Sequence, residues 1–156
     1  IVLSDVVKAS IKFLHEVISN PIYKPKIGNI EIEQDKTLVP RVESKHVCIL
    51  PSGKLHFKAI ESQISEGHVE YGERAENLPI LGEANIINIL DRIDDDTIQL
   101  TVELHYFPKT FIDKLKFQLS KPLLKLGSKK SYSALKNYAE NNQQPLTEEL
   151  YCIKWY

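Results

Sequence analysis

The chain is poor in the features that mark several common classes of protein. Its 156 residues include no methionine, only two cysteines and no N-x-[ST] glycosylation motif. No apolar run approaches the roughly 18 residues of a membrane-spanning helix. The first apolar stretch is broken at Asp5, Lys8 and Lys12, so no signal peptide is visible. Because methionine is absent, we expect that residue 1 is not the translational start, which leaves room for a removed leader.

The two cysteines do not form a disulfide framework. Cys48 and Cys152 lie far apart in apolar contexts, and neither belongs to a C-x-x-C motif. Disulfides and glycosylation motifs are typical of secreted proteins, and the chain shows neither pattern. We therefore expect a reducing, cytoplasmic setting.

Motifs for nucleotides and metals are missing as well. The sequence contains neither a G-x-x-x-x-G-K-[ST] loop nor a G-x-G-x-x-G loop. Its five histidines show no H-x-x-x-H spacing and have no C-x-x-C motif beside them, which argues against a zinc site. We expect no metal and no cofactor.

Few residues stand out as candidates for catalysis. His46 and Cys48 would share one face of a strand, but residues two apart on a strand are separated by about 7 Å, too far for direct proton transfer. The run 94–96, all aspartates, lacks the spacing of a calcium loop and is typical of a hairpin turn. Glu83 and Asn85 begin a predicted strand, where they could anchor a ligand or satisfy the backbone of a bulge; we favour the bulge. We expect no catalytic residue.

Charge is spread unevenly along a chain whose formal net charge is −1. The segment from Lys109 to Lys136 has eight lysines and one acid, Asp113, so it carries +7 while the remainder carries −8. A basic helix can bind an anionic membrane or a nucleic acid, but a solvated lysine face is the simpler interpretation. Nucleic acid is not expected, because the aromatic residues of this helix turn inward. Weak contact with an anionic membrane stays open for Lys121, Lys125, Lys129 and Lys130.

Apolar spacing predicts a helix near the start of the chain. From Val6 to Ile18 the apolar residues recur every three or four positions. Ser4 or Asp5 would cap the start of this helix, and the Asn20-Pro21 pair would end it.

Alternating residues predict an antiparallel sheet of five or six strands in the middle of the chain. Turn residues separate the strands, and the clearest strand is the last, which alternates without a break. The predicted strands are Asn29–Glu33, Leu38–Leu50, Lys54–Ile64, His68–Arg74, Leu81–Ile93 and Thr97–Phe107.

A long amphipathic helix is predicted from Lys109 to Glu140. Its apolar row must be buried on the preceding sheet, which makes an α+β domain. Pro122 lies within the pattern, so we expect a kink or a break there. The segment Leu146–Tyr156 is too aromatic to be an idle tail, and we expect it to pack on the domain or add an edge strand.

Three stretches carry a resemblance to a known family. VISNPIYKPKIGNIEIE runs from a helix through Asn-Pro and a proline-rich turn into a strand. LPILGEANIINILDRIDDDTIQLTVEL contains a glycine, a strand, an acidic turn and a long strand, and SALKNYAEN ends a long helix. Over residues 1 to 141 the chain thus resembles the START-like SRPBCC superfamily, which shares its helix-grip fold with the birch pollen allergen family. That family begins with a full strand, for which only Ile1–Leu3 remains here, so we expect a short or truncated edge strand.

The resemblance implies a helix-grip fold, in which a curved antiparallel sheet wraps around a long C-terminal helix and leaves a deep apolar cavity. It implies that residues 1–141 form a polyketide cyclase-like or lipid-transport-like domain, with residues 142–156 as an extension. A hydrophobic small molecule or lipid would bind in the cavity without catalysis. The alternatives are a cyclase or hydrolase acting in the same cavity, and a membrane- or partner-binding module acting through the lysines.

Alternation along the strands and helical spacing suggest which side chains would line such a cavity. For each of them the alternative is a place in a solid core. The expected ligand-binding residues are Phe57, Tyr71, Ile86, Leu100, Val102, Leu104, Tyr106, Phe111, Leu115 and Leu124.

Overall fold

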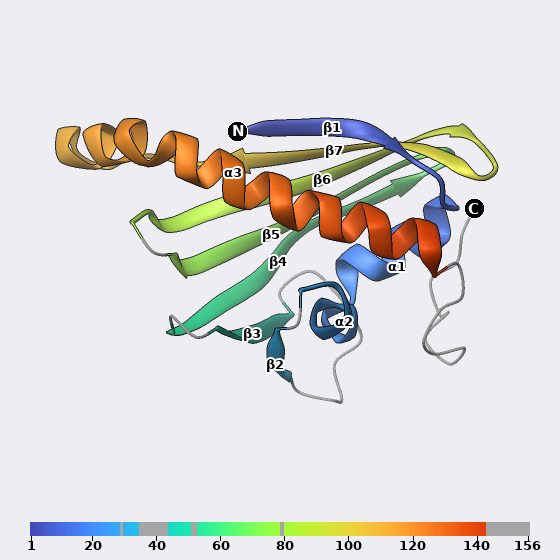
Figure 1. Ribbon diagram of the computed structural model, residues 1–156, viewed down its shortest axis with the longest axis horizontal. Coiled ribbons are helices and arrows are strands. Elements are labelled where there is room, and N and C mark those ends of the chain that lie inside the picture. The colour runs from blue at the N-terminus through green and yellow to red at the C-terminus, as the bar shows by residue number, and fades with distance from the viewer. Residues whose placement is uncertain (29, 35–43, 51–52, 79, 143–156) are drawn as a thin grey trace.

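A computed structural model describes residues 1–28, 30–34, 44–50, 53–78 and 80–142. Seven antiparallel strands form one curved sheet in the order β1-β7-β6-β5-β4-β3-β2 (Figure 1). Neighbours along the chain pair with each other except at one edge, where β1 pairs with β7. The strands are β1 (Val2–Val7), β2 (Glu31–Gln34), β3 (Lys45–Leu50), β4 (Gly53–Ser65), β5 (His68–Leu78), β6 (Gly82–Asp94) and β7 (Thr97–His105).

Helices cover one face of this sheet. The long helix α3 crosses the face diagonally, while α1 and α2 lie on the same side near one end of α3 (Figure 1). The opposite end of α3 extends past the ends of the strands (Figure 1). The helices are α1 (Ile11–Ser19), the 3-10 turn η1 (Pro21–Tyr23), α2 (Lys24–Gly28) and α3 (Phe111–Asn141). The architecture confirms the predicted α+β helix-grip arrangement.

The N-terminal segment differs from its prediction. Residues Val2–Val7 form a full six-residue strand, so the edge strand is neither short nor truncated. The helix begins at Ile11 instead of Val6, and its cap is Ser10, whose side chain accepts a hydrogen bond from the Phe13 amide. Consecutive β-branched residues favour the extended conformation when a strand is available to pair with, and β7 provides one. The helix ends at Ser19, as the Asn20-Pro21 pair predicted.

The central strands largely follow the alternation. The predicted strand 68–74 continues to Leu78 and the strand 81–93 is shifted to Gly82–Asp94, because their pairing extends to the turn. The predicted strand 29–33 is found at 31–34, and the last strand ends at His105. Of the predicted strand 38–50, only Lys45–Leu50 falls within the described strands, and residues 35–43 lie outside the described residues.

The long helix begins at a reciprocal cap. The Thr110 hydroxyl accepts from the Asp113 amide at 3.1 Å, and the Asp113 carboxylate accepts from the Thr110 amide at 3.1 Å. The helix then runs unbroken through Pro122 to Asn141, so the break allowed at Pro122 does not occur. The predicted contacts of Leu146–Tyr156 lie outside the described residues.

The solid core is concentrated where α1 and the C-terminal half of α3 meet the sheet. Leu14 on α1, Leu90 on β6 and Leu100 on β7 are fully buried there, together with Ala139 of α3. Tyr132 closes this core from above, because its hydroxyl donates to the Leu100 carbonyl at 2.9 Å. The other half of α3 buries none of its residues.

Candidate functional site

A hollow lies between α3 and the sheet. The closest backbone approaches of α3 are to β1, α1 and α2, so its middle stands away from the central strands. The space left has a volume of about 420 Å³. Small residues on the helix help to keep it open, since a Cβ atom added at Gly127 would meet no other atom within 4 Å.

Most of the lining of this cavity is apolar. The strands contribute one wall and α3 contributes the roof. The lining residues are Ile1, Leu3, Leu78, Leu81, Ile86, Asn88, Val102, Leu104, Leu123, Leu124, Gly127, Ser128, Ser131, Tyr132 and Leu135.

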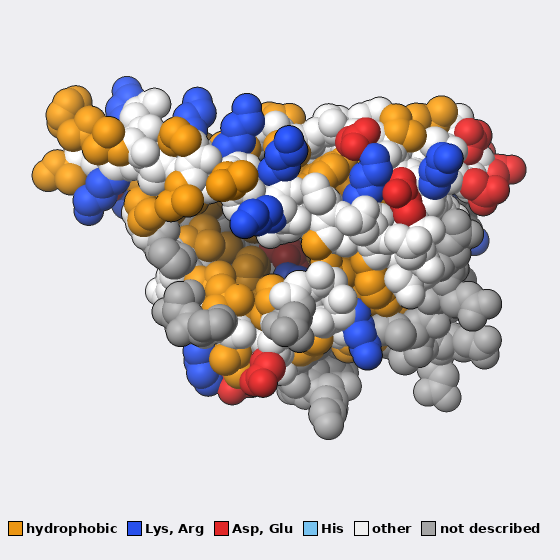
Figure 2. Space-filling model, viewed as in Figure 1, with side chains coloured by type: hydrophobic (Ala, Val, Ile, Leu, Met, Phe, Trp, Pro, Cys, Tyr) orange, Lys and Arg blue, Asp and Glu red, His pale blue; other side chains and the backbone are white. Residues whose placement is uncertain are grey.

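A smaller hollow of about 200 Å³ adjoins the larger cavity beneath α3. The two share Ile86, Asn88, Ser131 and Leu135, so they form one continuous lining. The smaller hollow adds Lys24 and thereby α2, and it adds Glu73 from β5. Figure 2 shows the opening below the long helix, ringed by apolar side chains with an acidic and a basic side chain deep inside.

Lys24 and Glu73 belong to a polar cluster at the floor of the smaller hollow. The Lys24 ammonium donates to Glu73 Oε2 at 2.9 Å and to His46 Nε2 at 2.7 Å. The Tyr71 hydroxyl donates to Glu73 Oε1 at 3.2 Å. Glu73 and His46 are only 5% and 4% exposed, so two groups that usually face water are held inside.

An aromatic shelf supports the ammonium from the side. The His46 ring stacks on Phe57 with 5.1 Å between ring centroids, and the two residues are direct partners across β3 and β4. Lys24 Nζ lies 4.2 Å from the centroid of the same Phe57 ring. An ammonium over an aromatic face is attracted by the ring's negative quadrupole. The shelf thus fixes Lys24 where it can reach Glu73.

Burial keeps most of the cluster uncharged. Desolvation, helped by the nearby Lys24 charge, lowers the pKa of His46 to about 4, so its neutral ring can accept the ammonium proton. Desolvation and the adjacent Glu73 raise the pKa of Tyr71 far above its ordinary value. Burial also raises the pKa of Cys48, so this thiol stays protonated and unreactive. The one cation, Lys24, and the one anion, Glu73, therefore balance each other.

Asn88 connects this polar end to the apolar cavity. Its side chain is 7% exposed and lines both hollows. Asn88 Nδ2 donates to the Tyr71 carbonyl at 3.3 Å, which fixes the orientation of the amide. Among the described residues, Asn88 Oδ1 has no hydrogen-bond partner, and it is available to a molecule inside.

Solved structures share the fold of this chain. An aromatase/cyclase, Zhui, from a Streptomyces species superposes with a TM-score of 0.68 at 12% identity, covering 92% of this chain and 94% of its own. Norcoclaurine synthase from Thalictrum flavum, in complex with dopamine and hydroxybenzaldehyde, gives 0.60 at 16% identity, covering 93% and 88%. An HSP90 activator from Plasmodium falciparum gives 0.54 at 11% identity, covering 78% and 87%.

The chain has the helix-grip fold that these solved structures share. No family model and no curated protein matches the sequence. The three helix-grip structures have different roles, and the identities are low, so they establish the fold and leave the function to be argued from the site.

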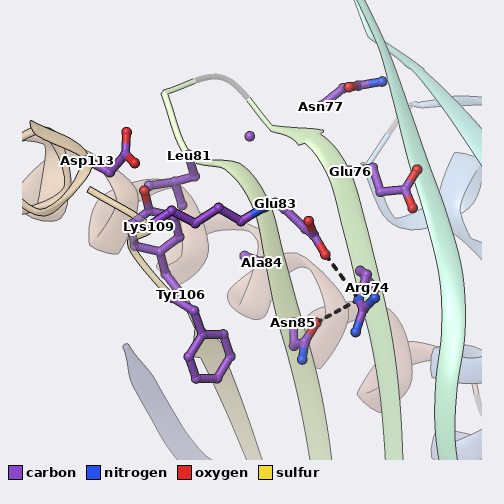
Figure 3. Close-up of a pocket in the computed structure, with 12 residues that line it drawn as sticks. Arg74, Glu76, Asn77, Leu81, Glu83, Ala84, Asn85, Tyr106, Lys109 and Asp113 are labelled. Carbon is purple, nitrogen blue, oxygen red and sulfur yellow. Dashed lines mark hydrogen bonds and ion pairs between the residues drawn. The ribbon is translucent and has the colours of Figure 1, made fainter.

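A second depression lies at the end of the β5–β6 hairpin, outside the helix-grip cavity. It has a volume of about 640 Å³ and is broad and polar. Figure 3 shows Arg74 on one side of it, bound to Glu83 and Asn85, with Lys109 and Asp113 on the other side. Arg74 Nε is 3.3 Å from Glu83 Oε1 and 3.4 Å from Asn85 Oδ1. Glu83 and Asn85 are therefore not among the residues that line the helix-grip cavity. The pairing of β5 with β6 does shift beside Glu83, between Glu76 and Leu78, as the expected bulge requires, while the two side chains themselves contact Arg74.

The structure brings four of the predicted ligand-binding residues together around the larger cavity. They lie on β6, on β7 and on α3, as their faces predicted. These four are Ile86, Val102, Leu104 and Leu124.

Three other predicted residues lie at or beside the floor. Leu100 is fully buried in the solid core, which is the alternative that the alternation left open. Phe57 forms the shelf under Lys24. Tyr71 contributes its hydroxyl to the polar cluster and its ring to the core.

The remaining three lie away from the hollows. Phe111 and Leu115 are 81% and 51% exposed, so the expectation that they face the sheet is corrected. They occupy the first turns of α3, where the helix extends past the ends of the strands (Figure 1). Tyr106 packs on Phe117 with ring centroids 5.1 Å apart and lines the outer depression.

Sequence reasoning missed the polar cluster. Tyr71 and Glu73 are two apart on β5, so alternation places both on the inner face, and this signal was available. Lys24 and His46 gave no such signal, because α2 and β3 meet only in the folded chain. Among the described residues, no three His, Cys, Asp or Glu side chains gather as a metal site would require. Within the same part of the chain, no helix is long and apolar enough to cross a membrane.

Proposed function

We propose that the protein binds a hydrophobic small molecule or a lipid between the sheet and α3, without covalent chemistry. The observation that carries this proposal is the apolar cavity of about 420 Å³ beneath α3. Ligand sites of small molecules are concave, mostly apolar and supplied with a few polar groups. The cavity has this character, and its volume falls within the range of about 300–1,000 Å³ that is usual for such sites.

The pairing of charges within the polar cluster also supports a binding role. Lys24 and Glu73 neutralise each other through a 2.9 Å ion pair, and His46 is neutral above about pH 4. A cluster whose charges are already paired orients a bound molecule more readily than it transfers protons.

Filling the cavity from its roof tests the proposal. Gly127 lines the cavity, and a Cβ atom added there would meet no other atom within 4 Å, so Gly127→Phe introduces a large side chain at the cavity wall. Its neighbour Leu126 is 53% exposed, and Leu126→Phe is the matched control. The measurement is native mass spectrometry of the purified protein after mixing with lipid extract, with bound mass compared among the wild type and both variants.

We expect bound apolar molecules in the wild type and in Leu126→Phe, and at least a tenfold loss in Gly127→Phe. A folded wild-type protein that retains no apolar molecule under any of these conditions would sink the proposal. Equal retention by Gly127→Phe would place the ligand elsewhere and would also contradict it.

A second candidate function is a cyclase- or hydrolase-type enzyme using the same cavity. It is favoured by one observation, the convergence of Glu73, His46, Tyr71 and Lys24 beside the hollow. Hydrolysis of p-nitrophenyl hexanoate tests it, because the acyl chain can occupy the cavity. Turnover that disappears in both Glu73→Gln and Gly127→Phe would favour the enzyme, and turnover unaffected by either would exclude this site.

We also propose that α3 contacts an anionic membrane surface. The notable feature is an exposed apolar stripe along its first half, where Phe111, Ile112, Leu115, Leu119, Leu123 and Leu126 are each at least 51% exposed. Lys121, Lys125, Lys129 and Lys130 are exposed on the same helix. An apolar stripe with lysines matches the chemistry of an anionic lipid interface, where each basic residue contributes about 1 kcal/mol.

The stripe also meets the cavity, which links membrane contact to the transfer of a lipid. Leu123 is 65% exposed and at the same time lines the larger cavity. A membrane docked on the stripe would therefore lie next to the ligand.

Vesicle co-sedimentation tests the membrane contact. We expect binding to vesicles of phosphatidylcholine mixed with phosphatidylserine and loss of that binding in Leu119→Ser. Ile93→Ser, which changes another exposed apolar residue, at the end of β6, is the control and should bind as the wild type does. Sedimentation that is independent of phosphatidylserine, or equal in both variants, would contradict the role of this stripe.

A further inference from the structure

The polarity of the continuous cavity is graded from one end to the other. Its larger part is lined mainly by leucine, isoleucine and valine side chains. Its smaller part contains Lys24 and Glu73, and Asn88 lies at the junction. A molecule that occupies both parts must therefore have an apolar body and one polar end.

The polar end of the cavity is electrically balanced. Glu73 Oε2 and Lys24 Nζ form an ion pair at 2.9 Å, and the His46 ring beside them is held neutral by its burial. Among the described residues that line this end, no charged group is left unpaired for an ionised group on a ligand. Burying such a group without a partner is strongly unfavourable, so a neutral head group fits and a carboxylate or an ammonium does not.

Apart from the Ser131 hydroxyl, which can donate or accept, the free hydrogen-bonding capacity at this end consists of acceptors. Asn88 lines the cavity and donates through Nδ2 to the Tyr71 carbonyl, which leaves its Oδ1 without a partner among the described residues. Each Glu73 oxygen receives one donor and retains lone-pair capacity for another. The Lys24 ammonium, by contrast, is already directed at Glu73, at His46 and at the Phe57 ring. A ligand that satisfies Asn88 Oδ1 or Glu73 therefore donates a hydrogen bond to this end.

We infer that the ligand is a neutral alcohol or phenol whose hydroxyl donates to Asn88 Oδ1 or Glu73 while its hydrocarbon part fills the larger cavity. This inference rests on the proposed binding function and specifies its ligand class. A hydroxyl can also accept a hydrogen bond, and the hydroxyls of Ser128 and Ser131 on α3 line the same space. An ether of the same shape lacks the proton that the two acceptors require.

Three probes with one ring system separate these possibilities. The probes are 1-naphthol, which donates a proton, 1-methoxynaphthalene, which does not, and 1-naphthoate, which is an anion. Affinities are measured by titration calorimetry on the full chain at neutral pH. We expect 1-naphthol to bind about tenfold more tightly than either of the others, which corresponds to one satisfied hydrogen bond at a buried acceptor.

Two substitutions at the polar end sharpen the test. Asn88→Leu keeps the volume and removes the acceptor, so the preference for 1-naphthol over 1-methoxynaphthalene should fall severalfold. Glu73→Gln keeps the shape and leaves Lys24 without its anion, so 1-naphthoate should gain about tenfold in affinity. Glu83→Gln removes an acid that pairs with Arg74 outside the cavity, and it should change none of the three affinities.

The outcomes distinguish this inference from the proposed function. Equal binding of the three probes, blocked by Gly127→Phe, would overturn the inference and leave the cavity as a binding site. Tighter binding of 1-naphthoate than of 1-naphthol by the wild type would also overturn it. Failure of all three probes and of lipid extract to bind would overturn the proposed function itself. The wild-type comparison decides the inference even if a variant does not fold.

Discussion

The two halves of α3 have opposite surroundings, and the half that is richer in large apolar side chains is the more exposed one. In the C-terminal half, Tyr132 and Ala139 are buried against the sheet and α1. In the N-terminal half, Leu119 is 76% exposed and Phe111 is 81% exposed. The difference comes from the partners, because the strands and α1 lie under the C-terminal half while the N-terminal half extends beyond the sheet (Figure 1). Amphipathic spacing therefore shows that a helix can be buried, and its neighbours determine how much of it is.

The largest expected contrast between the halves concerns stability. Tyr132→Ala removes a side chain that is 8% exposed and its hydrogen bond to the Leu100 carbonyl, so it should lower the free energy of unfolding by about 3 kcal/mol or more. Leu119→Ala, in the other half, should change it by less than about 0.5 kcal/mol. Urea unfolding followed by circular dichroism measures both. Equal losses would mean that the first half of α3 is also packed in solution.

Acid should destabilise the packed region through its buried histidines. The pKa of His15 and that of His46 are each lowered from 6.5 to about 4, mainly by burial and, for His46, also by Lys24. Because these folded-state values lie below the unfolded value, the unfolded chain takes up protons first as the pH falls from 6.5 to 4. Stability should therefore decrease within that window, by up to about 3 kcal/mol per histidine, with no further loss from these groups below it.

Urea midpoints measured at intervals between pH 7 and pH 4 test this dependence. His46→Gln retains an acceptor for Lys24 but cannot titrate, so its stability should fall less steeply across the window than that of the wild type. A wild-type midpoint that stays constant from pH 6.5 to pH 4 would contradict the burial of both rings.

The smallest effect belongs to the roof of the cavity. Gly127 lies inside a helix, and a Cβ atom added there would meet open space. Gly127→Ala should therefore raise the free energy of unfolding by about 0.5–1 kcal/mol. Thermal unfolding measures the gain. A loss of stability would mean that α3 lies closer to the sheet than the cavity requires, so even this small change reports on the hollow.

The sequence predicted the sheet and the long helix well because both obey local periodicities. Alternation placed Val102 and Leu104 on the inner face of β7, and helical spacing placed Leu124 toward the sheet. The start of the first helix was wrong, because Val6 and Val7 fit helical spacing and the strand conformation equally well. Only pairing with β7, some 90 residues away in the register Val7↔Ile98, decides between the two.

The candidate site was predictable only where one element supplied the pattern. The polar cluster joins α2, β3 and β5, and no local rule relates Lys24 to Glu73 across 49 positions of the chain. Likewise, the exposure of Leu115 depends on where the strands end, which is a property of the sheet as a whole. Periodicity in the sequence does not predict which distant segments come into contact or which segments stay without contacts.

The pairing of β1 with β7 also has a consequence for how the chain reaches this state. Leu3 forms part of the cavity wall and pairs with Val102, so the wall cannot be completed until the seventh strand is available. Contacts between residues so far apart in sequence slow folding, because a long loop must close before they form. During synthesis, β1 would therefore stay unpaired, and the cavity would stay open on one side, until β7 has been made. A ligand of the kind proposed would therefore meet a complete cavity wall only after β1 has paired with β7.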